Sequence, residues 1–431
     1  MEQQTAAQAV GEAAGRARAA AGSLAAASDA TIDGALRAMA RLLGEVEPAV
    51  LAANRLDVEQ AREDGMGEGL LDRLRLDPAR LAEMARQLEI LAGTAPEPAY
   101  RHVRDLPGDL VVQEWRRPVG AIGANFEARP NVTVDIASQL VKSRNAGVLR
   151  TGSAALRSAI ALIDQVVGPG LAEVGLDPDA VQLVRVPGRE SAEALVQQPG
   201  LLPLVILRGS GESTRSLARL AALSGVRTLA HADGGAVMYL HPSADRAMAA
   251  DLIDRGLDRL GVCNRLNLLL VDERIWDETV PGVVDQLAAR QPKITASLPP
   301  HDHPVGYEWA LTSGNEATVT IAPAAGPLDA ARIANEETSG LAAVVVAEDP
   351  AAAGEFLAAY AGTGAFWNAT SRLLDGFKLL AVPETGINID RVPGPRGPVT
   401  FRDLYLRQYV VLPAGRNPSV GQESPADLRK R

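Results

Sequence analysis

The segment Val119-Gly-Ala-Ile-Gly123 decides the fold, because it is a short apolar run that predicts a buried strand ending in a loop. A helix is expected behind it over 134–143, and the apolar residues 146–150 predict the next strand. The alternation continues with a helix over 153–167 and with two further strands, at 181–186 and 204–207. Strands separated by helices at this spacing predict an α/β protein with a doubly wound, mostly parallel sheet.

The flanking segments extend this pattern in both directions. Ala and Leu recur at helical spacing from Thr5 to about Ala95, and Asp77-Pro78 combines an N-cap acid with a proline at the first helical position. The alternating residues 109–116 predict a strand. Further strands are expected downstream, at 237–240, 268–271, 341–347 and 405–412.

Composition and charge favour a soluble, cytoplasmic protein. The 431 residues suffice for two or three domains, and the net charge of -10 argues against nucleic acid or an anionic membrane as the main partner. The single cysteine excludes an internal disulfide and favours a reducing compartment. No apolar run approaches the roughly 20 residues of a membrane span, and residues 1–41 lack the apolar core of a signal peptide.

The only thiol, Cys263, lies in Leu260-Gly-Val-Cys-Asn264, just before a β-type run. Cysteine is nucleophilic as its thiolate, and its ordinary pKa of about 8.5 allows a modest local field to activate it. A lone cysteine is more often an inert buried residue than a nucleophile. Here the preceding glycine permits a tight turn and Asn264 offers a hydrogen bond, and both features favour a nucleophile presented from a loop.

Glycine-containing turns and arginines at strand ends are candidates for binding an anion. The turn Arg208-Gly-Ser-Gly-Glu-Ser213 follows a strand and precedes a helix, where main-chain N–H groups point at a ligand. It lacks the third glycine of the dinucleotide fingerprint, so an ordinary turn is an equal interpretation. Arg129 and Arg150 each follow an apolar run, where parallel sheets bind ligands, but a solvated or salt-bridged arginine explains either one equally well. His301-Asp-His303 lies in a proline-rich loop with no third ligand nearby, so no metal site is expected.

Longer motifs identify a family. The chain contains Pro118-Val-Gly-Ala-Ile-Gly-Ala-Asn-Phe-Glu-Ala-Arg-Pro-Asn-Val-Thr-Val-Asp135, followed by Lys142 and Asn145-Ala-Gly-Val-Leu-Arg150. This run resembles the signature of the gamma-glutamyl phosphate reductase (glutamate-5-semialdehyde dehydrogenase) family, which is part of the aldehyde dehydrogenase superfamily. The resemblance extends from about residue 5 to 412, and the other segments that carry it are Leu71-Asp-Arg-Leu74, Gly261-Val-Cys-Asn264, Asn368-Ala-Thr-Ser-Arg372 and Asp375-Gly376.

The resemblance implies an aldehyde dehydrogenase-like α/β fold. A Rossmann-type nucleotide-binding domain is expected from residues 1–107, 119–232 and 376–398, and an α/β catalytic domain with Cys263 from residues 233–375. Residues 108–118 and 399–412 would form a small β flap for oligomerisation, which favours a homodimer or a homotetramer. The polar residues 413–431 are expected to form a mobile tail.

The resemblance also implies a reaction, the NADPH-dependent reduction of an acyl phosphate. In this family L-glutamyl 5-phosphate becomes glutamate 5-semialdehyde, on the route to proline, through a thioester on the cysteine. Cys263 is expected to be the nucleophile, with its own N–H and Asn264 or Asn131 holding the oxyanion. The residues expected to contact the substrate are Arg129, Asn368, Ser371 and Arg372. Those expected to bind the cofactor are Arg150, Arg208, Gly209, Ser210 and Gly211, with Arg150 suited to the adenosine 2′-phosphate of NADP.

Departures from the family patterns keep alternatives open. Hydrolytic aldehyde dehydrogenases carry a general-base Glu in a Glu-Leu-Gly-Gly run, where this chain has His231-Ala-Asp-Gly-Gly235, so the thioester should await phosphate or hydride instead of water. Differences at 336–341 and 382–398 leave room for a divergent paralogue that reduces another activated acid in specialised metabolism. A coenzyme A-dependent aldehyde dehydrogenase and a non-catalytic partner of the upstream kinase are the remaining alternatives.

Overall fold

The computed structural model describes residues 5–127, 129–209, 211–231, 234–310, 314–391 and 394–416. The chain divides into two compact units. The first comprises residues 1–230, 382–386 and 399–431, and the second comprises residues 231–381 and 387–398. Each unit contains a sheet with parallel strand pairs, which confirms the predicted α/β class.

The sheet of the first unit has the strand order β5-β4-β3-β6-β7. β3 pairs in parallel with β4 on one side and with β6 on the other. The chain therefore builds outward from β3 in two directions, which makes the carboxyl ends of β3 and β6 a topological switch point, where such sheets bind ligands. The strands are β3 (Ala121–Phe126), β4 (Ala146–Thr151), β5 (Val181–Leu183), β6 (Leu204–Arg208) and β7 (Arg227–His231).

The helices of the first unit include the helical region predicted at the amino terminus. The predicted start of a helix at Asp77-Pro78 is confirmed, because the Asp77 carboxylate caps it by accepting a hydrogen bond from Arg80 N at 2.8 Å. The helix predicted over 153–167 is wrong in detail, since a π-helical turn occupies Ile163–Val167 and helical backbone continues beyond it. The helices are α1 (Ala6–Ala26), α2 (Asp29–Glu45), α3 (Glu47–Glu63), α4 (Glu68–Leu74), α5 (Pro78–Gly93), α6 (Pro130–Lys142), α7 (Leu156–Leu162), α8 (Gly168–Glu173), α9 (Arg189–Leu195) and α10 (Gly211–Leu223).

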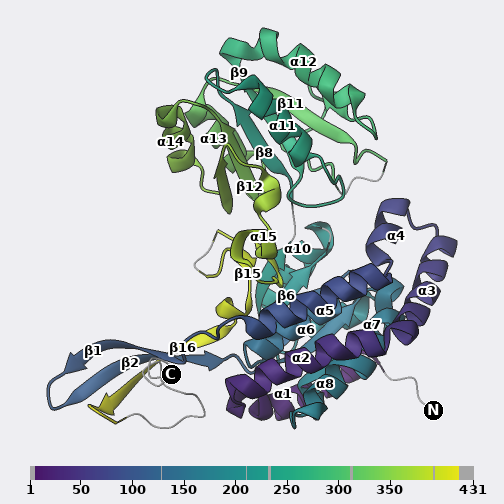
Figure 1. The fold of residues 1–431 in the computed structure, drawn as a ribbon, viewed down its shortest axis with the longest axis vertical. Helices are drawn as coiled ribbons and strands as arrows, with labels where there is room; N and C mark the ends of the chain where they lie inside the picture. The colour runs from purple at the N-terminus through teal and green to yellow at the C-terminus, as the bar shows by residue number, and fades with distance from the viewer. Residues whose placement is uncertain are drawn as a thin grey trace. The chain divides into compact units, whose positions relative to one another are not determined.

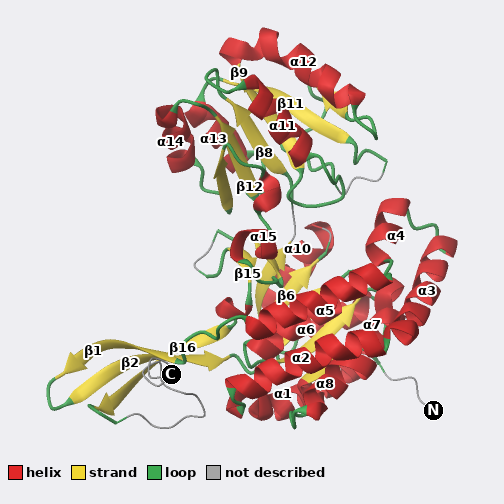
Figure 2. Ribbon diagram, in the orientation of Figure 1, coloured by secondary structure: helices red, strands yellow, loops and turns green. Residues whose placement is uncertain are grey.

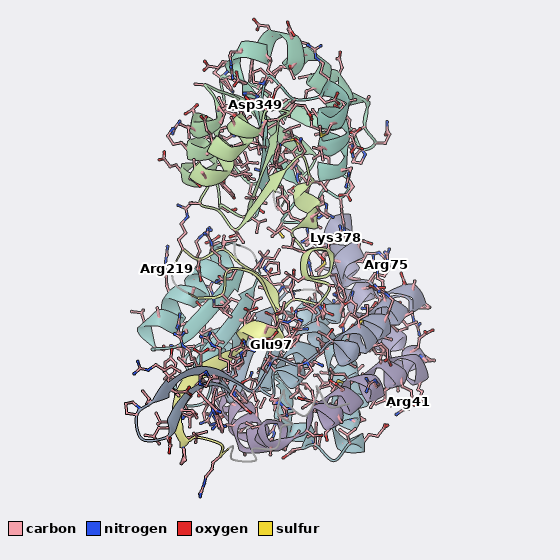
Figure 3. The ribbon with its side chains drawn as sticks, turned by 60° about the vertical axis from the view of Figure 1, so that its left-hand side comes forward. Arg41, Arg75, Glu97, Arg219, Asp349 and Lys378 are labelled. Carbon is pink, nitrogen blue, oxygen red and sulfur yellow. The ribbon has the colours of Figure 1, made fainter. Side chains whose placement is uncertain are left out.

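A three-stranded antiparallel sheet forms the flap, with β2 (Leu110–Pro118) between β1 (Tyr100–Leu106) and β16 (Tyr405–Pro413) (Figure 1). The strands predicted at 109–116 and 405–412 are thus present, whereas β1 was not predicted. Glu97, labelled in Figure 3, forms ion pairs with Arg116 of β2 at 2.5 Å and with Arg402 at 2.9 Å. These pairs fasten the base of the flap to the returning carboxyl-terminal segment.

The sheet of the second unit has the order β10-β11-β9-β8-β12-β13, and each neighbouring pair is parallel. Alternate residues of β8 face opposite sides, since Met238 packs in one core with α11 and α12, and Tyr239 packs in another with α13 and α14. Figure 2 shows these two pairs of helices beside the sheet. The strands are β8 (Ala236–Leu240), β9 (Leu266–Asp272), β10 (Thr295–Ser297), β11 (Thr318–Ala324), β12 (Ala342–Val346) and β13 (Gly364–Trp367). The helices are α11 (Arg246–Gly256), α12 (Trp276–Ala289), α13 (Pro327–Glu336), α14 (Pro350–Ala359) and α15 (Gly376–Leu380), and β14 (Gly386–Asn388) pairs with β15 (Gly397–Val399) in a separate sheet.

The boundaries of the units differ from those expected. Residues 376–381 and 387–398, assigned from the sequence to the nucleotide-binding domain, belong to the second unit. Side-chain hydrogen bonds explain why, since Arg391 donates to Asn335 O at 2.6 Å and Arg396 donates to Ala361 O at 2.7 Å. Of the tail predicted at 413–431, Pro413 ends β16, and residues 417–431 lie outside the described residues.

Candidate active site

Cys263 lies in a turn just before the amino end of β9, and its side chain is partly exposed. Its carbonyl oxygen accepts a hydrogen bond from Gly235 N at 2.7 Å. Two residues later, the carbonyl oxygen of Arg265 accepts one from Ala236 N at 2.8 Å. The turn is therefore fastened to the segment that leads into β8. The turn therefore has a fixed position, and the thiol that it carries is partly exposed to solvent.

The carboxylate of Glu308 lies next to the same turn, although no sequence motif indicates it. Its Oε2 accepts a hydrogen bond from Gly234 N at 2.9 Å. A Cβ placed on Gly234 would lie 2.6 Å from Glu308 Oε1 and 2.8 Å from the Cα of Cys263. The carboxylate and the cysteine thus flank one glycine, which has no room for a side chain.

Asn267, on β9, holds the loop that carries Glu308. Its Nδ2 donates to Tyr307 O at 2.7 Å, and its Oδ1 accepts from Trp309 N at 2.9 Å. The residues on both sides of Glu308 are therefore bonded to the strand that follows Cys263. Sequence spacing gives no signal for this pairing, because the loop and the turn are far apart along the chain.

Asn264, Ser371 and Arg372, three of the predicted site residues, are brought together. Asn264 is 5% exposed, its Nδ2 donates to Leu374 O at 2.9 Å, and its Oδ1 accepts from Arg372 Nη1. Ser371 Oγ donates to the carbonyl of Asn264 at 2.8 Å, and Arg372 Nε donates to Asp258 at 2.7 Å. These bonds use the Asn264 amide to fix the turn, so its predicted contact with an oxyanion is not what this geometry favours.

Asn368 is not brought to Cys263. Its Nδ2 donates to Ala347 O and its Oδ1 accepts from Ala347 N, both at 3.0 Å. It follows the carboxyl ends of β12 and β13, whereas Cys263 precedes the amino end of β9 in the same parallel sheet. Asn368 therefore closes a turn at the carboxyl ends of the strands, whereas Cys263 lies at the amino ends, which argues against the substrate contact expected from the resemblance.

Arg150 is the penultimate residue of β4, in the first unit, and is 8% exposed. Its guanidinium donates to Ser191 Oγ and Asn125 Oδ1, both at 3.1 Å, and to Gly188 O at 2.5 Å. Burial lowers the pKa of Arg150, and the nearby Glu127 carboxylate opposes that effect. Three of its five N–H donors are thus used in bonds to other described residues.

Arg129, Asn131 and Arg208 are brought together around Asp135, on α6. Asn131 Nδ2 donates to Asp135 Oδ2 at 3.0 Å. Burial raises the pKa of Asp135 to about 6, and the charge of Arg208, the hydrogen bond from Asn131 and the charge of Arg129 oppose the rise. Two cations, Arg129 and Arg208, therefore act on the Asp135 carboxyl group beyond the carboxyl ends of β3 and β6.

The glycine turn after β6 passes close to the loop after β3. A Cβ on Gly209 would lie 2.8 Å from Glu127 Oε1 and 3.4 Å from Thr214 Oγ1. Gly211 begins α10, and the amino-terminal N–H groups of a helix are of the kind that binds an anion, while Ser210 lies outside the described residues. Only a glycine at position 209 allows the two loops to approach so closely, and this turn at the start of α10 forms a small cradle beside the Glu127 carboxylate.

The remaining candidates do not add a ligand site. His303 Nε2 lies 2.7 Å from Ser297 Oγ, and its ring packs against Trp309 with centroids 4.8 Å apart. Within the described ranges, no group of His, Cys, Asp and Glu side chains is arranged to hold a metal ion. No described helix is both long and apolar enough to span a bilayer.

Comparisons with known proteins agree on one family. The model of the aldehyde dehydrogenase family matches residues 3–300. Gamma-glutamyl phosphate reductase of Gluconobacter oxydans is 35% identical over 93% of this chain and 94% of that protein, and the enzyme of the same name from Clavibacter michiganensis is 34% identical over 93% of each. Among solved structures, gamma-glutamyl phosphate reductase of Thermotoga maritima has a TM-score of 0.84 at 28% identity and covers 95% of this chain and 100% of that one. An acetylating aldehyde dehydrogenase from Geobacillus thermoglucosidasius shares the fold, with a TM-score of 0.70 at 16% identity, and covers 96% of this chain and 98% of that one.

Proposed function

Because the chain belongs to the aldehyde dehydrogenase family and, within it, to the gamma-glutamyl phosphate reductases, we propose that it reduces L-glutamyl 5-phosphate to glutamate 5-semialdehyde. The observation that carries this proposal is the partly exposed thiol of Cys263, in a turn whose carbonyls accept hydrogen bonds from Gly235 N and Ala236 N. An acyl phosphate suits such a nucleophile, because phosphate is a good leaving group and the resulting thioester is a good hydride acceptor.

The residues of the second unit perform the covalent steps. The Cys263 thiolate attacks the acyl carbon, the bond from that carbon to the phosphate oxygen breaks, and inorganic phosphate leaves. The main-chain N–H of Cys263 is the donor proposed for the oxyanion, since the Asn264 amide is occupied by Leu374 and Arg372. Reduction of the thioester gives a thiohemiacetal, whose collapse releases the aldehyde and regenerates the thiolate.

The family implies a nicotinamide cofactor, which supplies the hydride, and we propose NADPH as its form. The residues of the first unit fit such a group: the cradle at Gly209 and the start of α10 suit its pyrophosphate. Arg150 has two N–H donors left for a 2′-phosphate, and Arg129 and Arg208 lie at the same strand ends as further cations.

A second activity, hydrolytic oxidation of a free aldehyde, is favoured by one observation. Glu308 brings a carboxylate to the Cys263 turn, although the run before β8 lacks the glutamate of hydrolytic relatives. A carboxylate beside a thioester is the group that would activate water. Its Oε2 already accepts the hydrogen bond from Gly234 N, and the similarity to gamma-glutamyl phosphate reductases supports the acyl-phosphate reaction over hydrolysis.

The test runs the reaction in reverse, because acyl phosphates are labile. The protein is given glutamate 5-semialdehyde and NADP or NAD, with phosphate, with coenzyme A or with neither, and the absorbance of the reduced cofactor is followed. We expect turnover that requires phosphate, is faster with NADP and is abolished in Cys263→Ala. Turnover that is independent of phosphate would establish the hydrolytic activity instead, and turnover only with coenzyme A would contradict the proposal.

The same proposal has consequences beyond the site. It assigns the protein to proline biosynthesis in the cytoplasm, with the labile substrate delivered by an upstream kinase. It also assigns oligomerisation, as a homodimer or a homotetramer, to the flap formed by β1, β2 and β16.

A further inference from the structure

Two segments in which the chain departs from the family patterns, 336–341 and 382–398, contact each other in the second unit. A Cβ on Gly340, which precedes β12, would lie 3.5 Å from Arg391 Nη2. The same Cβ would lie 3.7 Å from the Cα of Gly362, which precedes β13. Both departures therefore shape one place, beside the amino ends of two neighbouring parallel strands.

The loop before β12 also contacts the Cys263 turn. Ser339 Oγ donates to Gly234 O at 2.8 Å, and a Cβ on Gly234 would lie 2.8 Å from the Cα of Cys263. Contacts therefore lead from the cysteine to this loop, and from the next residue of the loop, Gly340, to the guanidinium of Arg391. An acyl chain whose reacting carbon is at the thiol would extend its far end toward this guanidinium.

Arg391 and Arg396 carry charges that no described Asp or Glu pairs with. Arg391 Nη2 donates to Asn335 O at 2.6 Å, and Arg396 Nη1 donates to Ala361 O at 2.7 Å. Asn335 connects these two bonds, because its Oδ1 accepts from Ala361 N at 2.8 Å. Burial raises the pKa of Asp390, and the charge of Arg396 opposes that rise without a direct ion pair. Two cations bonded to neutral main-chain carbonyls are complementary to an anion.

Two hydroxyl groups in the same segment lack an acceptor. Tyr360 is 7% exposed, and its Oη, like Thr363 Oγ1, has no hydrogen-bond partner within the described ranges. The Tyr360 hydroxyl points at Gly362, since a Cβ there would lie 1.8 Å from Oη. A buried hydroxyl without a partner is costly and uncommon in native proteins. A carboxylate, which accepts hydrogen bonds and donates none, would suit both the hydroxyls and the arginines.

We propose that Arg391 and Arg396 set the specificity of the enzyme by binding the carboxylate at the far end of the acyl chain, with the hydroxyls of Tyr360 and Thr363 as further donors. The inference rests on the proposed function in that Cys263 is the nucleophile. It names the substrate class, which is the acyl phosphates of dicarboxylic acids. The phosphate of such a substrate is attached to the reacting carbon, so it is not the anion expected at the arginines.

The first test measures binding and needs no turnover. Cys263 is the only cysteine, so its alkylation by iodoacetamide reports on this residue alone, and the dicarboxylate glutarate should protect it. We expect Arg391→Gln and Arg396→Gln each to raise the glutarate concentration for half protection about tenfold, because each removes a charge-assisted hydrogen bond. Arg332→Gln is the matched control, since Arg332 pairs with two acids of its own helix, α13, and should leave protection as it is.

Two outcomes of this test would overturn the proposal. One is a protein that glutarate does not protect, or protects equally in the variants of Arg391 and Arg396. The other is protection by inorganic phosphate alone that these variants lose, because the arginines would then bind phosphate and not a carboxylate.

The second test compares two aldehydes in the phosphate-dependent oxidation, glutamate 5-semialdehyde and pentanal, which lacks the carboxylate. The ratio of their kcat/KM values should fall about tenfold in Arg391→Gln. Tyr360→Phe should lower the same ratio without lowering the midpoint of thermal unfolding, because it removes a hydroxyl that has no partner in the protein. A ratio that stays the same in Arg391→Gln, with the loss confined to KM for phosphate, would contradict the assignment.

The two tests separate this proposal from the proposed reaction. Glutarate protection that the arginine variants lose, in a protein without phosphate-dependent turnover, would reject the reaction and support the carboxylate site. Phosphate-dependent turnover with no glutarate protection would support the reaction and overturn the carboxylate site.

Discussion

Gly234 is the residue at which one added methyl group should have the largest effect on the site. A Cβ there would lie 2.8 Å from Cys263 Cα and 2.6 Å from Glu308 Oε1, so the turn and the loop must move apart. A shift of about 1 Å in a reacting group costs roughly a hundredfold in rate. We therefore expect Gly234→Ala to lower kcat of the phosphate-dependent reaction by about that factor, while circular dichroism shows a folded protein.

Gly354, in the middle of α14, is the matched control for that change. A Cβ at this position would meet nothing within 4 Å, so alanine fits without displacement. Gly354→Ala should stabilise the helix by roughly 0.5–1 kcal/mol and leave kcat unchanged. Equal kcat values for the two variants would contradict the close packing inferred around Cys263.

The residues of the site differ in how far the sequence reveals them. Cys263 is identified by being the only thiol and by its motif, and Ser371 and Arg372 by a second motif. Glu308 and Asn267 have no such signal, because each contacts its partner through hydrogen bonds between segments that are distant in the sequence. Asn368 is the converse case, where a motif residue serves the turn at Ala347.

At the scale of elements, α6 offers a test through the acidity of Asp135. Burial raises its pKa to about 6, above the value of about 3.9 in an unfolded chain. The native state therefore binds more protons than the unfolded state between these values, so the free energy of unfolding falls as pH rises through this window and is level above it. We expect this contribution to lower the free energy of unfolding, measured with urea, by at most about 3 kcal/mol, and we expect it to be absent in Asp135→Asn. The prediction would be contradicted if the free energy of unfolding of the unmodified protein rose with pH over this window, relative to that of Asp135→Asn.

Fully buried strands were predicted from their apolar runs, whereas β1, β11 and β13 were missed for separate reasons. β3, β4 and β9 are buried along their whole length, so apolar runs predicted them. β1 is exposed over most of its length, and β13 alternates buried and exposed residues over only four positions. β11 contains Pro323, which argues against a strand in any sequence-based assignment.

At the scale of the whole molecule, the flap is the part expected to join subunits. Tyr409 and Val411, two residues apart on β16, share one face and are 59% and 53% exposed within the chain. Such an apolar face is typical of an interface. We expect the double variant Tyr409→Lys/Val411→Lys to sediment as a monomer, whereas the unmodified protein sediments as a dimer or tetramer.

The control for that variant places a single lysine on an exposed apolar residue elsewhere. Leu223, at the end of α10, is 87% exposed, so Leu223→Lys should leave the sedimentation coefficient as it is. An unmodified protein that is already a monomer would contradict the role of the flap, as would a flap variant that assembles normally.

The expected division of the chain came from the resemblance to the family and not from the sequence pattern. The placement of residues 387–398 could not be predicted, because it depends on contacts such as that of Arg391 with Asn335, which join segments far apart in the sequence.

The measurement that tests the central claim most directly is a single-turnover experiment on the acyl-enzyme. The protein is mixed with glutamate 5-semialdehyde and NADP without phosphate, and the reduced cofactor is followed while samples are quenched for intact-protein mass spectrometry. We predict a burst of about one reduced cofactor per Cys263, a matching acyl adduct on that residue, and release of the adduct with continued turnover once phosphate is added. Steady turnover without phosphate, or a burst with no adduct on Cys263, would contradict a thioester that waits for phosphate.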